Sequence, residues 1–228
     1  MCESLRQAAQ CLGLSGDISV VHDFFGYLEG VPNGSQLSLR GQMRALGGRH
    51  INLDLIQVAV EQFTETDRRR IDQAVQRTRE VFAQVDLGVG RAAHFQITES
   101  EADGLETIDS HSQAKKLTRR YRGPNNDAID VFFVREYNVD GKDGESRIDL
   151  PCDKDRRNYS GAVIGMGGDA GGLFPELLAH ELGHGLGLKH VTNEDNLMHD
   201  VITDIGLAAS QGAEMRSHCF ARAGCCEE

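Results

Sequence analysis

What the chain lacks excludes several classes of protein. No apolar run approaches the ~18 residues that a membrane span needs, so we expect no transmembrane segment. The first residues, "MCESLRQAAQCLGLSG", lack the basic start and apolar stretch of a secretory signal peptide. Either the protein is not exported by that route or the signal is missing from this chain. No two cysteines have the CxxC spacing, which leaves a zinc site built from four cysteines without support.

Positive charge is also scarce. The chain has 24 Lys and Arg against 35 Asp and Glu, a formal net charge of −11. Nucleic-acid binding needs clustered basic residues, so the balance argues against nucleic acid as a partner. The two basic runs, 68–70 and 115–122, are interpreted as solvated faces of helices.

The length of 228 residues predicts one large domain, or one domain with an extension. Such a chain can bury a sizeable core without disulfides. Residues 1–47 are interpreted as an N-terminal extension or a prosegment, with an integral first layer of the fold as the alternative. An even number of cysteines permits disulfides outside the cell but does not require them; the six are Cys2, Cys11, Cys152, Cys219, Cys225 and Cys226.

From residue 48 onward, strand and helix patterns alternate. Period-two and β-branched segments predict strands, and helical spacing of apolar residues predicts helices. Thr64 or Thr66 can cap the first helix. The expected order is strand 50–60, helix 64–85, strand 91–98, polar helix 110–121, strand 128–137 and strand 159–168.

An acidic, glycine-containing segment, 138–158, separates the last two of these strands. Its composition suggests a calcium site, but the EF-hand spacing fails. Lys142 stands at a ligand position, and Asp143 stands where glycine is needed. A plain surface loop and a structural Ca²⁺ site both stay open.

The densest chemical signal is "AHELGHGLGLKH", residues 179–190. A helix is expected over 174–185, with Pro175 in its first turn, where a missing N–H costs nothing. His180 and His184, four residues apart, project from one face, so both imidazoles can reach one metal ion. Glu181 is angled off this stripe and can hold a water on the metal without ligating the metal itself.

A third ligand is expected just past the helix. Gly187 can adopt a positive φ and turn the chain sharply, which would bring His190 back to the metal. Three histidines and a water form a catalytic Zn²⁺ arrangement, with one ion and one open position. Glu181 would take a proton from that water and deliver it to the leaving amine.

The alternative is a buried apolar helix that carries histidines by chance. A lone histidine on such a helix would be structural. The pattern H-E-x-x-H-x-x-G-x-x-H fixes five positions, however, and this makes a chance match rare. Metal binding is therefore the favoured interpretation, although the helix would be buried in either case by Leu177, Leu178, Leu182 and Leu186.

This motif resembles the long zinc signature of the metzincin metallopeptidases, and Met198 resembles their Met-turn methionine. The resemblance covers roughly residues 48–220. It implies an α+β, three-layer fold: a twisted mixed sheet with one antiparallel edge strand, backing helices, the active-site helix and a small C-terminal subdomain. The catalytic domain would be 48–228, divided into an upper part, 48–190, and a lower part, 191–228, with Met198 supporting the metal.

The resemblance also implies the activity, a zinc-dependent endopeptidase. Its polypeptide substrate would bind extended along the edge strand by β-augmentation, which the analogy places at Ala162, Val163, Ile164 and Gly165. The side chain after the scissile bond would enter a pocket walled by 191–204, made apolar by Leu197, Val201 and Ile202. Metzincins are mostly exported, which favours a secreted location. The pattern indicates no oligomeric state.

Two rival functions remain. One is a zinc hydrolase that acts on a non-protein amide. The other is a catalytically silent or non-proteolytic zinc protein of the same fold that binds a partner peptide. Glu181 argues against the silent protein, because a zinc scaffold does not need that carboxylate.

Some positions depart from the better-known metzincin families. Val191 stands where an acidic, proline or serine residue follows the third histidine, and Asp200 stands where some families have a zinc-ligating tyrosine. The segment "HVTNEDNLM" lacks the cysteines that give archaemetzincins a second zinc site. The sequence therefore indicates the clan and no single family. His199 is not expected to be a ligand, since three are already present.

Overall fold

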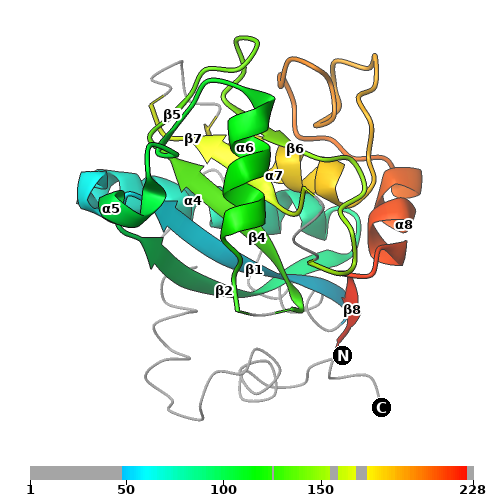
Figure 1. The fold of residues 1–228 in the computed structure, drawn as a ribbon. Coiled ribbons are helices and arrows are strands. Elements are labelled where there is room, and N and C mark those ends of the chain that lie inside the picture. The colour runs from blue at the N-terminus through cyan, green and yellow to red at the C-terminus, as the bar shows by residue number, and fades with distance from the viewer. Residues whose placement is uncertain (1–47, 125, 155–158, 168–173, 225–228) are drawn as a thin grey trace.

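The computed structural model describes residues 48–124, 126–154, 159–167 and 174–224, so the prediction for 1–47 lies outside the described residues. The elements, labelled in Figure 1, are β1 (Arg49–Val58), η1 (Val60–Gln62), α4 (Glu65–Ala83), β2 (Leu87–Ile97), α5 (Glu99–Ala102), β3 (Thr107–Ile108), α6 (His111–Arg120), β4 (Ala128–Val134), β5 (Glu136–Tyr137), β6 (Gly144–Ser146), β7 (Ala162–Gly165), α7 (Phe174–Gly185), α8 (Ala209–Ser217) and β8 (Arg222–Ala223).

The main sheet is mixed but mostly parallel. Its strand order is β2-β1-β4-β7-β6, with β8 paired to β1. The pairs β1–β2, β1–β4 and β4–β7 are parallel, whereas β6 runs antiparallel to β7 and β8 antiparallel to β1. All seven residues of β4 are buried, as a strand covered on both faces must be. The predicted mixed sheet with an antiparallel edge strand is confirmed.

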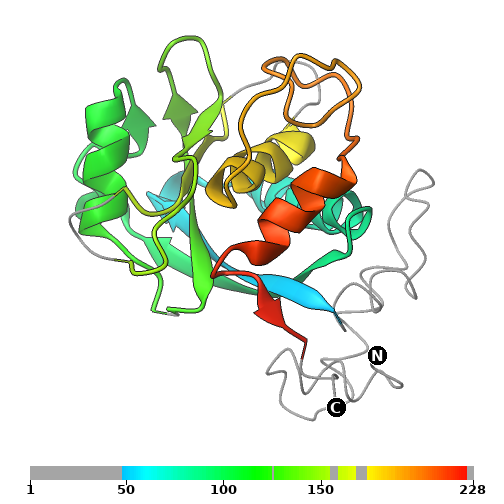
Figure 2. The ribbon, with the colours of Figure 1, turned by 90° about the vertical axis from the view of Figure 1, so that its right-hand side faces the viewer.

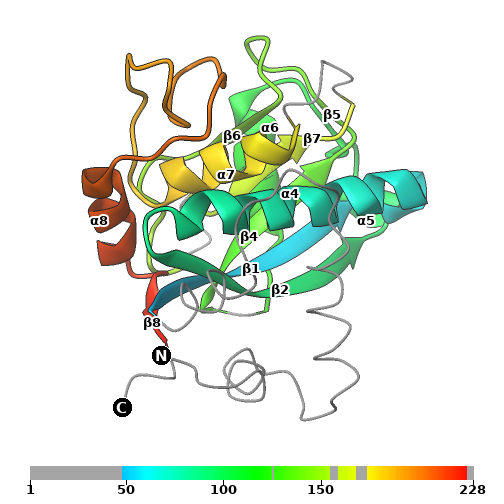
Figure 3. The same ribbon diagram turned by 180° about the vertical axis from the view of Figure 1, so that it is seen from behind.

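Helices cover both faces of this sheet. Figure 3 shows α4 and α7 on one face, and Figure 1 shows α6 in front of the other. Alternate side chains of the strands feed two cores. Leu53 and Val131 pack with Leu182 of α7 in one core, whereas Phe132 packs with Leu117 of α6 in the other. The predicted three-layer arrangement is therefore confirmed.

Helix α4 begins at the first of its two candidate caps. The Thr64 hydroxyl accepts the Asp67 N–H at 3.1 Å, and the Asp67 carboxylate accepts the Thr64 N–H at 2.9 Å. This reciprocal pair satisfies two N–H groups that a helix start leaves open. Arg77 of α4 then forms an ion pair with Glu176 of α7 at 2.8 Å, which holds the two helices together.

The position predicted for the edge strand is wrong. Residues Ala162–Gly165 form β7, an inner strand that pairs with β4 on one side and β6 on the other. The antiparallel strand at the end of the sheet is β6, inside the segment interpreted as a loop. The apolar residues of β7 are buried and suit an inner position, whereas Gly-Glu-Ser has no β-propensity and is a strand because it pairs with β7.

The chain after β6, residues 149–154, is here called the strap. The Asp149 N–H donates to the His184 carbonyl and the Leu150 N–H to the Gly185 carbonyl, both at 2.9 Å. These are carbonyls of the last turn of α7, which a helix end leaves without intrahelical partners. The strap therefore closes the end of α7, and its Lys154 reaches the buried Asp130 carboxylate at 2.6 Å.

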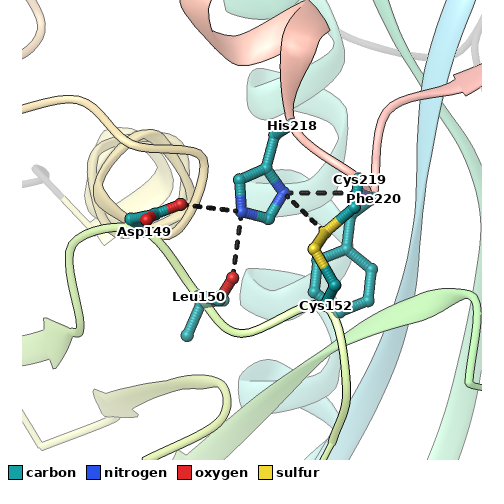
Figure 4. Close-up of a disulfide and its surroundings, with 6 residues drawn as sticks. All are labelled: Asp149, Leu150, Cys152, His218, Cys219 and Phe220. Atoms are coloured by element: carbon teal, nitrogen blue, oxygen red, sulfur yellow. Dashed lines mark hydrogen bonds and ion pairs between the residues drawn. A yellow bond between two sulfur atoms is a disulfide. The ribbon is translucent and has the colours of Figure 1, made fainter.

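A disulfide and a buried histidine fasten the strap to the C-terminal segment. Cys152 is bonded to Cys219, and both residues are exposed. Figure 4 shows His218 between the disulfide and the strap, where its Nε2 donates to the Leu150 carbonyl at 3.0 Å. The cross-link thus holds a segment that contacts the end of α7.

None of the described helices is long and apolar enough to cross a membrane.

Removing this disulfide should destabilise the fold. The cross-link joins residues 67 apart in the sequence, and closing a loop of that length is worth about 4 kcal/mol in the chain-entropy account. We expect the double variant Cys152→Ala/Cys219→Ala to lose stability of this order in urea unfolding followed by circular dichroism. The wild type unfolded under reducing conditions is the control, because it shows how much stability the protein loses when every disulfide is broken. An unchanged unfolding midpoint in the double variant would contradict the prediction.

Candidate active site

The three predicted histidine ligands meet at one point. Helix α7 presents His180 and His184, and the chain beyond it brings His190 back. The Nε2 atom of His190 lies 3.2 Å from Nε2 of His180 and 3.0 Å from Nε2 of His184. His180 and His184 are buried, whereas His190 is exposed. The three rings thus face one another across a space with one open side.

Two backbone carbonyls decide which ring nitrogens face that space. Nδ1 of His180 lies 2.7 Å from the Leu197 carbonyl, and Nδ1 of His184 lies 2.8 Å from the Leu188 carbonyl. A carbonyl only accepts, so each Nδ1 carries the proton and each Nε2 keeps a lone pair. Burial lowers the pKa of His180 to about 4 and also lowers the pKa of His184, which keeps both rings neutral.

These donors fit a zinc ion. Tetrahedral zinc with Zn–N bonds of about 2.0–2.1 Å places its nitrogens roughly 3.3 Å apart, close to the 3.0 and 3.2 Å separations here. The Nε2 atoms of His180 and His184 both carry lone pairs and no proton, so the lone pairs repel each other where they converge. A cation bound between them would turn that repulsion into attraction.

Gly187 makes the return to His190 sterically feasible. Its φ is +105°, as the motif predicted, and the Leu188 N–H bonds back to the Gly183 carbonyl at 3.0 Å. A Cβ at position 187 would also lie 3.3 Å from the Glu214 carboxylate. A side chain there would therefore be strained by the backbone and crowded by its neighbour.

Met198 packs directly against α7, where the Met-turn resemblance places it. Its side chain is fully buried, and its sulfur would lie 2.6 Å from a Cβ built on Gly183. The Val191 N–H donates to the Met198 carbonyl at 2.9 Å, which ties the methionine to the chain next to His190. A Cβ at position 183 would thus force the Met198 side chain to move, a constraint that the sequence analysis did not identify.

Glu181 is buried beside the histidines. Its Oε2 has no protein hydrogen-bond partner within the described ranges. The pKa of Glu181 is raised to about 8, mainly by burial and also by the nearby Glu145 charge, while Lys142 and a hydrogen bond from the Ser146 N–H act in the opposite direction. A carboxyl with one oxygen free and a raised pKa, beside a group of histidines that could hold a metal, is the environment expected of a general base.

The histidines and Glu181 open into a cleft of about 450 Å³. One side is formed by β6 and the loop before it, and the other by residues 200–202. Val201 and Ile202 line this cleft as expected. Leu197 instead is fully buried in the core and contributes its carbonyl. Figure 2 shows the segment between α7 and α8, in orange, above α7.

Sequence reasoning missed the residues that hold β6. The Glu145 carboxylate lies 2.5 Å from Nδ1 of His111 on α6 and accepts the Tyr159 hydroxyl at 3.0 Å. The two carboxylates near it, Glu145 and Asp140, raise the pKa of His111. No local signal marks this network, because its members are separated by the whole of β4 and a loop.

The described part of the acidic segment contains no set of three or more His, Cys, Asp and Glu side chains close enough to share one ion. Within the described ranges, the three histidines are the one set of three or more His, Cys, Asp and Glu side chains close enough to share an ion, with ligand atoms within 4.8 Å of one another. His199 stands outside this set, and its Nδ1 lies 2.8 Å from the Val201 carbonyl.

Zinc should stabilise the metal-free protein through these histidines. Ligand at 100 times its Kd contributes about 2.7 kcal/mol, which for a domain of this size is a rise in Tm of roughly 5–10 °C. We expect this rise in the wild type and in the His199→Ala variant, and its loss in the His190→Ala variant. Thermal unfolding with and without added zinc measures it. An equal rise in the His190→Ala variant would contradict the ligand set.

Comparison with solved structures finds proteins of similar fold. The chain is similar to metalloproteinase-II from Bacteroides fragilis, with 16% identity and a TM-score of 0.52 over 76% of this chain and 54% of that one. It also aligns with an archaemetzincin from Methanopyrus kandleri, with 14% identity and a TM-score of 0.47 over 73% of this chain and 94% of that one. A chain in a chaperone–substrate complex aligns with 16% identity and a TM-score of 0.49 over 68% of this chain, but over only 28% of its own length.

The sequence alone indicated no single family, because Val191 departs from the residues found there in the better-known ones. A family model now gives one. No curated protein sequence matches the chain. The model for the metallo-peptidase family M12B, reprolysin-like, matches residues 58–216, more than half of the chain. This range includes α4, the histidine motif and the Met-turn. The chain therefore belongs to the metallo-peptidase family M12B, reprolysin-like.

Proposed function

We propose that this protein is a zinc-dependent endopeptidase that hydrolyses peptide bonds of an extended polypeptide. One observation carries the proposal: three histidine Nε2 atoms converge beside the Glu181 carboxyl, whose Oε2 has no protein partner among the described residues, in a cleft bordered by the last strand of the sheet. Membership of a metallopeptidase family supports the reaction class. The substrate and the steps below are the proposal itself.

The proposed zinc site consists of His180, His184 and His190. A zinc ion held there would act as a Lewis acid that lowers the pKa of water and polarises the substrate carbonyl. The protein supplies fixed ligands: the Leu197 and Leu188 carbonyls hold two of the imidazoles in the tautomer that leaves Nε2 free.

Glu181 moves the proton. Its carboxylate takes a proton from the attacking water and passes it to the amine that leaves when the peptide bond breaks. Burial excludes competing water from this carboxyl, and its free Oε2 is available for the proton. Met198 supports α7 through its contact with Gly183.

The substrate strand adds to β6. In the described part of the chain, β6 is the last strand of the sheet and lines the cleft. An extended peptide can therefore hydrogen-bond to its open edge by β-augmentation. This replaces β7, whose edges are both already paired.

Glu181 separates this proposal from a zinc protein without catalysis. We expect the Glu181→Ala variant to bind about one zinc and to cleave a peptide library 10²–10⁴-fold more slowly, since that is the usual contribution of a general acid–base group. Glu176→Ala is the control, because Glu176 lies on the same helix but pairs with Arg77 outside the cleft.

Zinc content by atomic absorption and cleavage by mass spectrometry decide the outcome. If the wild type holds zinc and cleaves no peptide, the peptidase proposal fails, and the non-proteolytic zinc protein or a hydrolase for another amide takes its place. If the Glu181→Ala variant retains full activity, the proposed role of Glu181 is wrong.

The cleft wall should favour an apolar side chain after the scissile bond. Val201 is 60% exposed and lies with Ile202, Ile148 and Leu177 around the cleft. Because losing an apolar pocket contact is worth about 1–3 kcal/mol, we expect Val201→Asp to lower kcat/KM for peptides with leucine at that position by roughly tenfold or more. Val201→Ile, which keeps the wall apolar, should retain the preference. A cleavage profile identical in both variants would remove Val201 from the pocket.

A further inference from the structure

Two side-chain amides lie next to the metal centre without touching it. Asn196 precedes Met198 by two residues and is 7% exposed. Its Nδ2 donates to Oε1 of Gln211 on α8 at 2.9 Å, and its Oδ1 accepts from Nε2 of Gln211 at 3.1 Å. The two amides are thus paired head to tail, across a separation of 15 residues.

Backbone donors fix the orientation of both amides. The Met198 N–H donates to Oδ1 of Asn196 at 2.9 Å, and the Ala208 N–H donates to Oε1 of Gln211 at 2.8 Å. An N–H can point only to the oxygen end of an amide, so neither side chain can flip without losing a backbone bond. Ala208 starts α8 without a capping side chain, and Gln211 takes that role.

The turn held by this pair contacts the metal centre directly. Between Asn196 and Met198 lies Leu197, whose carbonyl receives the Nδ1 proton of His180 at 2.7 Å. Met198 packs against Gly183 of α7 on the same side. A shift of the turn would therefore move the group that orients His180. The Asn196–Gln211 pair fastens that turn to the start of α8.

We propose that Asn196 and Gln211 are positioning residues of the metal centre. They hold the turn 196–199 in the position in which the Leu197 carbonyl accepts the Nδ1 proton of His180 and so orients that ring toward the metal. The proposal rests on the zinc site of the proposed function. Partners one step removed from a metal ligand change metal affinity by about 10–100-fold when they are lost. A buried amide paired with a half-buried one is suited to this role, because the shift of either side chain leaves the hydrogen-bonding groups of the other without a partner.

The test compares zinc affinity with fold stability. The variants are Gln211→Ala, Asn196→Ala and the double variant. A fourth variant, Gln211→Glu, keeps the Oε1 acceptor and replaces the Nε2 donor with a carboxylate oxygen. Gln84→Ala is the matched control, because the Gln84 amide also holds this segment, at the Ile205 carbonyl, but lies away from the turn. Each protein is loaded with zinc in competition with a chromogenic chelator, and with cobalt for its visible spectrum, at a temperature where circular dichroism shows the metal-free form folded.

We expect Gln211→Ala to raise the zinc Kd about tenfold and to shift the cobalt absorption bands. The double variant should be little worse than either single one, because the two amides act as one unit. Gln211→Glu, which sets an oxygen against Oδ1 of Asn196, should also raise the zinc Kd, and Gln84→Ala should match the wild type.

A drop in Tm with unchanged zinc Kd and cobalt spectrum in the three variants would overturn the proposal and leave the pair a structural contact. If Gln211→Ala does not fold, Gln211→Glu decides by the same two readouts. A wild type that binds no zinc refutes the proposed function itself. A wild type that binds zinc and cleaves peptides, with the Gln211 variants indistinguishable from it, refutes the positioning role alone.

Discussion

Two hydrogen bonds from imidazole to backbone carbonyl hold this site in its working geometry. A neutral imidazole has one N–H, and His180 and His184 donate theirs to the carbonyls of Leu197 and Leu188. Each Nε2 is left with a lone pair aimed at the metal position. Both carbonyls belong to chain that follows α7. The helix therefore presents correctly oriented ligands only when the turn at Gly187 and the Met-turn are in place.

Two segments pack closely against helix α7, and the glycines at positions 183 and 185 leave room for them. Glycine inside a helix costs about 1 kcal/mol relative to alanine. At Gly183 the absent Cβ leaves room for the Met198 sulfur, and at Gly185 it leaves room for Leu150 of the strap, whose Cδ1 would lie 2.8 Å from that Cβ. The two glycines lower the helix propensity of α7, but they allow the Met-turn and the strap to pack closely against the helix that carries His180 and His184.

Burial has opposite effects on the pKa values of the two kinds of titratable group in this centre. It lowers the pKa of His180 to about 4 and raises the pKa of Glu181 to about 8, because both groups are driven to their neutral forms. Neutral histidines suit a metal ion directly. The carboxyl becomes a stronger base, and a nearby cation would favour its ionised form. Burial thus acts on the proposed ligands and on the proposed proton acceptor together.

The residues that carry the chemistry could be predicted because their relations are local. The i, i+4 spacing of His180 and His184, the capping turn at Thr64 and the positive φ of Gly187 are properties of a few adjacent residues. The sheet order depends on pairings between distant segments. A three-residue strand of Gly-Glu-Ser has no pattern of its own, so the analogy with known folds was applied to β7 instead of β6.

By itself, then, the sequence determined the helix, its ligand spacing and the order of elements, since periodicity and turn chemistry act within one or two turns of chain. Only the tertiary structure decided that β6 borders the cleft, that Cys152 pairs with Cys219, and that Leu197 contributes a carbonyl instead of a pocket wall. Those choices join residues from 17 to 67 positions apart. Such contacts depend on which surfaces can be buried against each other in the complete fold, and a short window of sequence does not contain that information.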